Sequence, residues 1–143
     1  MMNKILVAYD FSDSSKHALE MAVTIGEKFA AHIYVLHVAD PEPGFVGYDP
    51  GPGVVRDQMA TKYHAEHKQL QSDADQVREK YQNVTAILAQ GPVVDTILSE
   101  AEKLGVDMIV VGADNKSKLK EIMLGSVSKG VLDQENLAVL VCR

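Results

Sequence analysis

The sequence predicts an α/β fold: a single-domain, open, parallel five-stranded sheet with helices on both faces. Short apolar runs alternate with longer segments whose apolar residues recur at helical spacing, and this β-α-β-α-β-α-β-α-β order favours a parallel sheet. The 143 residues suit one hydrophobic core, and 46% hydrophobic with 24% charged residues is ordinary for a globular protein. Neither a repeat nor a linker divides the chain, so residues 1–143 are predicted to form one domain.

The first predicted unit is a strand followed by a helix. Residues 5–9 (ILVAY) form a short apolar run that is typical of a strand buried on both faces. The polar residues at positions 10–14 then offer several helix N-caps. Apolar residues at three- and four-residue steps predict a core-facing helical stripe made of Ala18, Met21, Ala22, Ile25 and Phe29.

The next two predicted strands, at residues 32–38 and 84–88, flank a long loop and a helix. Residues 40–53 hold four of the five prolines and four of the ten glycines, which predicts a loop long enough to act as a lid or mobile segment. A helix follows at 57–81, with one face made of Met59, Tyr63, Leu70, Ala74, Val77 and Tyr81. A third helix, marked by Val94, Ile97, Leu98, Ala101 and Leu104, is predicted to end at Gly105.

The last part of the chain predicts a strand at 108–111 that ends at Gly112, a helix at about 126–133 and a final strand. The final strand runs from Leu137 to Val141 without a charge or a proline. An exposed edge of this kind promotes aggregation, and pairing with its own copy across a two-fold axis would remove the edge. We therefore expect a homodimer through this strand.

The bulk composition excludes several classes of protein. A formal net charge of -6 argues against a general nucleic-acid binder, which normally shows a basic face. The single cysteine, Cys142, cannot form an internal disulfide, and it is expected to be a structural or incidental thiol. The apolar run at the N-terminus is too short for a signal peptide, and no run approaches the length of a membrane helix. We therefore expect a soluble, cytoplasmic protein without a membrane partner.

A ligand site is predicted where the first and fourth strands end, at Asp10 and Gly112. Ligands of open α/β sheets bind outside the carboxyl ends of strands where the strand order reverses, so these residues would share a crevice if their strands are neighbours. Gly125 and Ser126 stand at a helix start, where backbone N–H groups suit a phosphate. The same pair is also ordinary capping, and neither GxxxxGK[ST] nor GxGxxG is present. Both interpretations stay open on the residues alone.

Four segments together resemble the universal stress protein family. They are KILVAYDFSDSSKHALEMA (4–22), HIYVLHVADP (32–41), LGVDMIVVGADNKSKLKEIMLGSVSKGVL (104–132) and LAVLVCR (137–143). The resemblance covers essentially the whole chain, with the motifs in the family's order and spacing. It implies a Rossmann-like fold of the adenine-nucleotide alpha-hydrolase-like kind.

The ATP-binding branch of that family carries Gly-x-x-Gly, nine further residues and then Gly-Ser or Gly-Thr. Gly112 occupies the first position and Gly125-Ser126 the last, whereas Asn115 stands where the pattern has glycine. Asparagine tolerates a left-handed backbone at a cost of about 1 kcal/mol, or roughly fivefold in affinity. A side chain that intruded on the phosphate would weaken binding further.

The resemblance implies an ATP-binding, homodimeric, nucleotide-dependent stress-response or signalling protein, with Mg²⁺ or Mn²⁺ as a companion of the nucleotide. It implies a nucleotide site made of Ala8, Tyr9, Asp10, Val38, Gly112, Asn115, Gly125, Ser126, Val127 and Ser128. It also implies a dimer through the strand from Leu137 to Val141. No catalytic residue and no protein metal ligand is expected, so efficient hydrolysis is not predicted and slow turnover is left open.

Two other functions stay open. A nucleotide-independent stress-response interaction module follows if Asn115 weakens the site, and a small hydrolase or transferase would use the same crevice. Asp10 is either a ligand contact or a strand-end residue that caps the next helix.

The remaining polar residues favour structural roles. His64 and His67 share a helix face but lack a third ligand, so zinc is not predicted. His37, at the end of a buried strand, is expected to be packed and hydrogen-bonded. A solvated loop face is the expected role of three lysines, and anion steering is the alternative: Lys116, Lys118 and Lys120.

Overall fold

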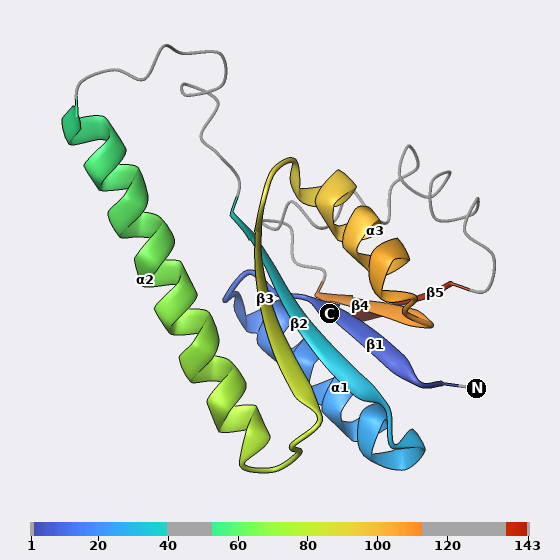
Figure 1. Cartoon of the computed structure of the whole chain (residues 1–143). Helices are drawn as coiled ribbons and strands as arrows, with labels where there is room; N and C mark the ends of the chain where they lie inside the picture. Colours follow the sequence, from blue (N-terminus) through green and yellow to red (C-terminus); the bar gives the residue numbers. More distant parts are fainter. Residues whose placement is uncertain (1, 40–52, 113–136, 143) are drawn as a thin grey trace.

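The computed structural model describes residues 2–39, 53–112 and 137–142, which form eight helices and strands in alternating order up to β4 (Figure 1). The predicted loop at 40–53 lies almost entirely outside these ranges, and the helix predicted at about 126–133 lies wholly outside them. The elements are β1 (Lys4–Ala8), α1 (Asp13–Phe29), β2 (His32–Ala39), α2 (Gly53–Arg78), β3 (Val84–Gln90), α3 (Val93–Leu104), β4 (Met108–Gly112) and β5 (Ala138–Cys142).

The five strands form one parallel sheet in the order β3-β2-β1-β4-β5. Ala8 of β1 pairs with Leu36 of β2 on one side and with Val111 of β4 on the other. The chain therefore moves outward from β1 to β3 and then crosses back to β4, so the order reverses between β1 and β4. The predicted parallel five-stranded α/β fold is confirmed.

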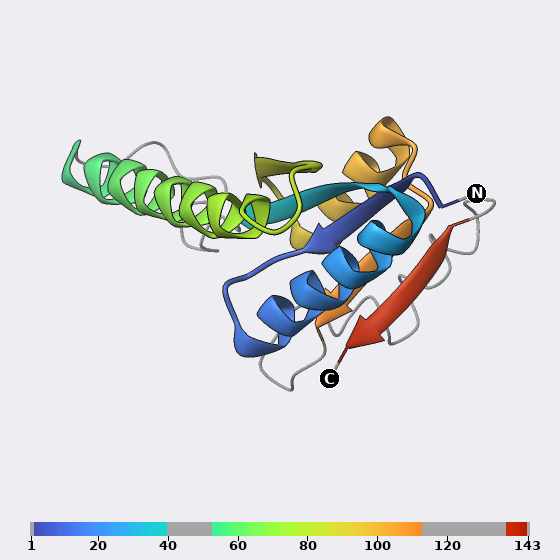
Figure 2. The same ribbon diagram turned by 90° about the horizontal axis from the view of Figure 1, so that it is seen from below.

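The helices cover both faces of the sheet, as predicted (Figure 2). Ile5, Val7 and Tyr9 point to the face covered by α1 and α2, and Leu6 and Ala8 point to the face covered by α3. This alternation follows from the two-residue period of a strand. Because both faces are covered, β1 and β4 are buried along almost their whole length, which explains why they read as continuous apolar runs.

Helix α1 turns a different face to the sheet from the one predicted. Its buried residues are Ser15, Ala18, Leu19, Ala22 and Gly26, whereas Met21 is 37% exposed and Phe29 is 60% exposed. The prediction was therefore right for Ala18 and Ala22 and wrong for Met21 and Phe29. Small residues were decisive, because they let the helix approach β1 and β4 closely, and periodicity of large apolar residues does not detect such a face.

Helix α2 begins at Gly53 and ends at Arg78, so both boundaries of the predicted 57–81 helix are shifted toward the N-terminus. Leu70 and Ala74 are buried as predicted. The helix ends in a turn in which the N–H groups of Lys80 and Tyr81 both bind the carbonyl of Val77. In Figure 2 the N-terminal part of α2 extends past the sheet, whereas Leu70 and Val77 in its C-terminal half belong to the core that covers the sheet.

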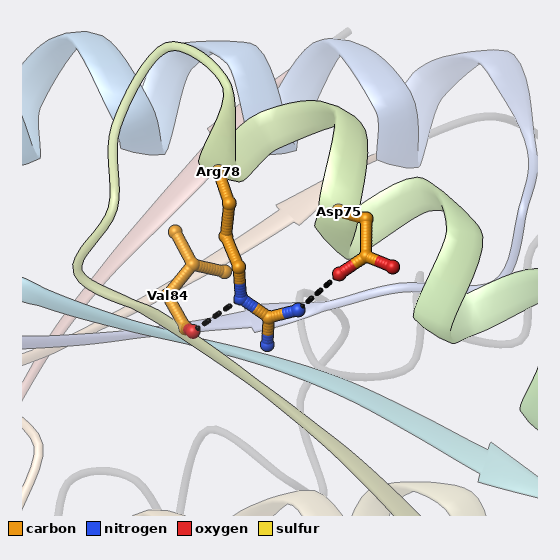
Figure 3. Close-up of polar contacts among 3 residues, drawn as sticks. All are labelled: Asp75, Arg78 and Val84. Atoms are coloured by element: carbon orange, nitrogen blue, oxygen red, sulfur yellow. Dashed lines mark hydrogen bonds and ion pairs between the residues drawn. The ribbon is translucent and has the colours of Figure 1, made fainter.

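The C-terminal end of α2 is tied to the start of β3 by Arg78. Its Nε donates a hydrogen bond to the carbonyl of Val84 at 3.0 Å, and its Nη1 lies 2.6 Å from Oδ1 of Asp75 (Figure 3). The predicted C-cap of α3 is also confirmed, because Gly105 has a φ of 66°, a left-handed conformation that glycine adopts readily. Within the described ranges, no helix combines the length and the apolar character needed to cross a membrane.

Candidate functional site

The candidate site lies where β1 and β4 end, at the point where the strand order reverses. The pairing of Ala8 with Val111 brings the following residues, Asp10 and Gly112, to the same edge of the sheet. The structure therefore confirms that the two strand-end features predicted to share a site belong to neighbouring strands. Open α/β sheets bind ligands at this position for topological reasons, because the crossover connections leave in opposite directions.

Gly112 is required for the close contact between β4 and the first turn of α1. A Cβ atom at this position would lie 2.4 Å from the carbonyl carbon of Ser14 and 2.6 Å from the backbone nitrogen of Ser15. Both atoms belong to the backbone, so no rotamer change could relieve the overlap. The glycine assigned to the nucleotide site by resemblance thus also has a packing role, which the sequence interpretation did not include.

The carboxylate of Asp10 shapes the turn that leads into α1. Its Oδ1 accepts hydrogen bonds from the backbone N–H of Ser12, at 3.1 Å, and from the Ser12 hydroxyl. Ser12 is the N-cap, and its Oγ accepts a bond from the N–H of Ser15. Asp10 therefore supports the helix cap without being the cap residue itself. A capping role and a ligand contact are compatible, because a carboxylate has about four acceptor sites.

The main chain of Tyr9 is already engaged within the protein. Its N–H donates to the carbonyl of Leu36 at 2.8 Å, and its carbonyl lies 2.9 Å from Nδ1 of His37. Its hydroxyl donates to Oδ2 of Asp73 on α2 at 2.6 Å. Burial raises the pKa of the Tyr9 hydroxyl well above its ordinary value, and the hydrogen bond and charge of Asp73 raise it further. Tyr9 therefore stays protonated, and its backbone carbonyl keeps a second lone pair that could accept from a ligand.

Ala8 and Val38, the other predicted contacts in the described ranges, are buried on the α3 side of the sheet. The structure thus places Ala8, Tyr9, Asp10, Val38 and Gly112 at the ends of three adjacent strands. The remaining predicted site residues lie outside the described ranges: Asn115, Gly125, Ser126, Val127 and Ser128, together with Lys116, Lys118 and Lys120.

A cluster at the carboxyl ends of β1 and β2 was only partly foreseen. The Phe11 ring packs 5.2 Å from the Tyr9 ring and 4.6 Å from the His37 ring, between centroids. Phe11 has a φ of 65°, a strained left-handed conformation for an aromatic residue. His37 is buried and hydrogen-bonded, as predicted, and its Nε2 lies 3.3 Å from Oε2 of Glu66 on α2. No local sequence signal could have indicated Glu66 or Asp73, because their contacts depend on the docking of α2. The contact of Phe11 with His37 depends on the pairing of β1 with β2.

A groove of about 860 Å³ between α1 and α2 lies on a different part of the surface. It reaches Tyr9 and Asp73 but none of Ala8, Asp10, Val38 and Gly112. The residues that follow β2 and β4 border the candidate site but fall outside the described ranges, so a groove among the described residues does not include them. The strand ends and the fold topology therefore locate the candidate site better than this groove does.

Metal and thiol chemistry find little support among the residues that the structure describes. That part of the chain contains no group of three or more His, Cys, Asp and Glu side chains suited to a metal ion. His64 and His67 are exposed on α2. Cys142 is buried, and its burial raises the pKa of the thiol, which makes the reactive thiolate scarcer.

The comparisons with known proteins agree on one family over the whole chain. The model of the universal stress protein family matches residues 1–143. "Universal stress protein YxiE" of Bacillus subtilis is 34% identical over 148 residues, which span 100% of both chains. Universal stress protein UspA from Lactobacillus plantarum has a TM-score of 0.77 at 25% identity, covering 99% of this chain and 98% of its own. A universal stress protein from Archaeoglobus fulgidus in complex with dAMP has a TM-score of 0.63 at 20% identity, covering 100% and 98%, and shows the fold alone.

Proposed function

This chain belongs to the universal stress protein family, and from that premise we propose that it is a homodimeric, ATP-binding protein of the stress response. The observation that carries the proposal is the meeting of Asp10 and Gly112 at the strand-order reversal, with Gly112 in contact with the first turn of α1. The dAMP complex of a protein with this fold adds that the fold can hold an adenine nucleotide.

The charges of the described residues suggest how the nucleotide lies. The Asp10 carboxylate is an acceptor, so it suits the hydroxyl and amino groups of adenosine and would repel the phosphates. The first turn of α1 is also unsuited to a phosphate, because it contains the negative Asp13 and because the Ser12 hydroxyl already accepts from the N–H of Ser15. We therefore assign the adenosine to Ala8, Tyr9, Asp10 and Val38. The motif assigns the ribose and phosphates to Gly112, Asn115, Gly125, Ser126, Val127 and Ser128.

A divalent cation, Mg²⁺ or Mn²⁺, would accompany the phosphates and reduce their charge near Asp10. We propose no general base and no efficient hydrolysis, and we place the protein in the cytoplasm. Conformational or partner changes between nucleotide states would then constitute the output. The second copy would pair along the last strand, predicted from Leu137 to Val141 and observed as β5 from Ala138 to Cys142, which is an edge of the sheet.

Isothermal titration calorimetry with ATP and Mg²⁺ tests the proposal. We expect saturable binding, about fivefold tighter binding by Asn115→Gly, and loss of binding by Gly125→Leu. Glu102→Gln, on the exposed part of α3, is the matched control and should bind like the wild type. No heat of binding at millimolar ATP, in a protein that also releases no adenine nucleotide on denaturation, would leave the nucleotide-independent module as the better account.

The dimer is tested separately by sedimentation velocity. We expect a dimer that Ala138→Glu converts to a monomer, because Ala138 is exposed on β5 and two like charges would meet near the two-fold axis. A monomeric wild type would remove the dimer from the proposal without affecting nucleotide binding.

A further inference from the structure

The contact between His37 and Glu66 has an unusual hydrogen-bonding state. His37 is buried, with 7% of its surface exposed, and its Nδ1 lies 2.9 Å from the carbonyl oxygen of Tyr9. A carbonyl oxygen can only accept, so Nδ1 must carry a proton. The other ring nitrogen, Nε2, lies 3.3 Å from Oε2 of Glu66 but has no hydrogen-bond partner among the described residues.

The protonation state of His37 decides whether this contact attracts or repels. In the neutral ring only one nitrogen carries a proton, and here that nitrogen is Nδ1, so the lone pair of Nε2 faces a carboxylate. A second proton on Nε2 turns the ring into a cation that faces the Glu66 carboxylate at 3.3 Å, and the two groups then form an ion pair. Uptake of one proton therefore changes the link between β2 and α2 from unfavourable to favourable.

A second link joins α2 to the same edge of the sheet and provides an internal reference. The Tyr9 hydroxyl donates to Asp73, seven residues after Glu66, so both acidic residues lie on the same side of α2. Tyr9 keeps its proton over the whole neutral range because its pKa is raised. The Tyr9–Asp73 link is therefore insensitive to pH in this range, whereas the His37–Glu66 link is not.

Few other charged groups face His37 in the described ranges. Asp10 follows β1, and Glu66 and Asp73 lie on α2, while Gln69 donates to Asp73 and adds no charge. Lys16 and Glu20 of α1 line the groove that also reaches Tyr9 and Asp73, and His37 is not among its lining residues. On β3, the residue paired with His37 is Leu88, which does not titrate. Among the described residues, the charged side chain in direct contact with the imidazole is that of Glu66.

We propose that His37 is a positioning residue whose protonation docks α2 against the strand ends and holds Tyr9 and Asp10 in place at the nucleotide site. The chain of contacts runs from Glu66 through the imidazole to the Tyr9 carbonyl, one residue before Asp10, and the Phe11 ring packs on the imidazole. The effect on nucleotide binding rests on the proposed function, and the effect on α2 does not.

Nitrogen-15 spectra of the imidazole test the protonation step without nucleotide. At pH 8 we expect His37 to carry its proton on Nδ1, which faces the Tyr9 carbonyl, and at pH 6 we expect a second proton on Nε2, which faces Glu66. Finding the proton on Nε2 at pH 8, or no change between pH 8 and pH 5, overturns the proposal.

Amide hydrogen exchange in residues 63–78 then tests the docking of α2. The ratio of wild-type protection to Glu66→Gln protection should be about fivefold higher at pH 6 than at pH 8. The variant is the reference because its amide can donate to the neutral Nε2 and does not titrate. Tyr9→Phe should lower protection equally at both pH values. An equal pH response in wild type and Glu66→Gln overturns the docking step.

Calorimetry with ATP tests the consequence for the site. The ratio of the wild-type to the Glu66→Gln dissociation constant should fall about fivefold from pH 8 to pH 6, since titration of the phosphates cancels in the ratio. His37→Asn keeps a donor for the Tyr9 carbonyl and should bind ATP with no such change. A constant ratio overturns the positioning role. Proton-dependent exchange without ATP binding would instead uphold the link and overturn the proposed function.

Discussion

At the edge of the sheet where the strands begin, polar side chains bind backbone groups far away in sequence. At the edge where the strands end, polar side chains bind other side chains as well as backbone groups. Asp107 illustrates the first kind of contact. Its Oδ2 accepts from the N–H groups of Asn3, at 2.8 Å, and Lys4, at 3.0 Å, and so joins the start of β4 to the start of β1.

Other contacts at the amino edge follow the same pattern. Lys4 Nζ donates to the carbonyl of Leu104 at the end of α3, and the Tyr81 hydroxyl donates to the carbonyls of Gly26 and Ala31 around the end of α1. These contacts satisfy helix ends and strand starts, which have no partner within their own element.

The carboxyl edge contains contacts that a ligand or a proton can change. Asp10 binds Ser12, Tyr9 binds Asp73, and His37 faces Glu66. Side-chain partners can rotate away or change protonation at smaller cost than a backbone ladder. The two edges thus differ in role. Contacts that stabilise the fold lie at the amino ends of the strands, and contacts that can respond to a ligand or a proton lie at the carboxyl ends of the same strands.

The largest expected effect is that of Gly112→Ala at the carboxyl edge. The added Cβ would overlap the backbone of Ser14 and Ser15, so we expect the free energy of unfolding to fall by about 3 kcal/mol and ATP binding to be lost. Urea denaturation and calorimetry measure the two effects. Gly105→Ala is the control, because its Cβ meets no atom within 4 Å and only the left-handed φ costs about 1 kcal/mol. Equal losses in both variants would contradict a packing role for Gly112.

Asp107→Ala is the matching change at the amino edge. Loss of two charge-assisted hydrogen bonds should lower the free energy of unfolding by about 2 kcal/mol, while the folded protein keeps its ATP affinity. Asp95→Ala, on the exposed start of α3, serves as the control and should cost less. A fall in ATP affinity without unfolding would show that the two edges are not separate.

The pH dependence of the same contact sharpens this result. The hydrogen bond from the Asn3 N–H, followed by that from Lys4, holds the pKa of Asp107 below its ordinary value. A lowered pKa in the folded state means that the stabilisation is complete above the ordinary pKa of an aspartate and is lost as the pH falls through the folded value. The stability difference between wild type and Asp107→Asn should therefore shrink in acid and stay constant from pH 6 to pH 8.

Tyr9→Phe should have the smallest effect. The ring and its contacts with Phe11 remain, and only the hydrogen bond to Asp73 is lost, so we expect about 1 kcal/mol less stability. Thermal denaturation should show the same loss at pH 6 and pH 8, because the hydroxyl does not titrate there. A loss that grew with pH would indicate that Asp73 and Tyr9 share the proton-dependent behaviour assigned to His37 and Glu66.

The sequence by itself determined the order of the elements, the parallel sheet, the ends of β1 and β4 as the candidate site, and the family. These features depend on local apolar runs, on Gly105 and on motifs whose spacing is visible in the chain. The tertiary structure alone decided which face of α1 is buried, because Ser15 and Gly26 pack through their smallness, and periodicity favoured Met21 and Phe29 instead. It also decided that Gly112 touches α1 and that Glu66 faces His37, because helix docking brings together residues that no sequence spacing relates.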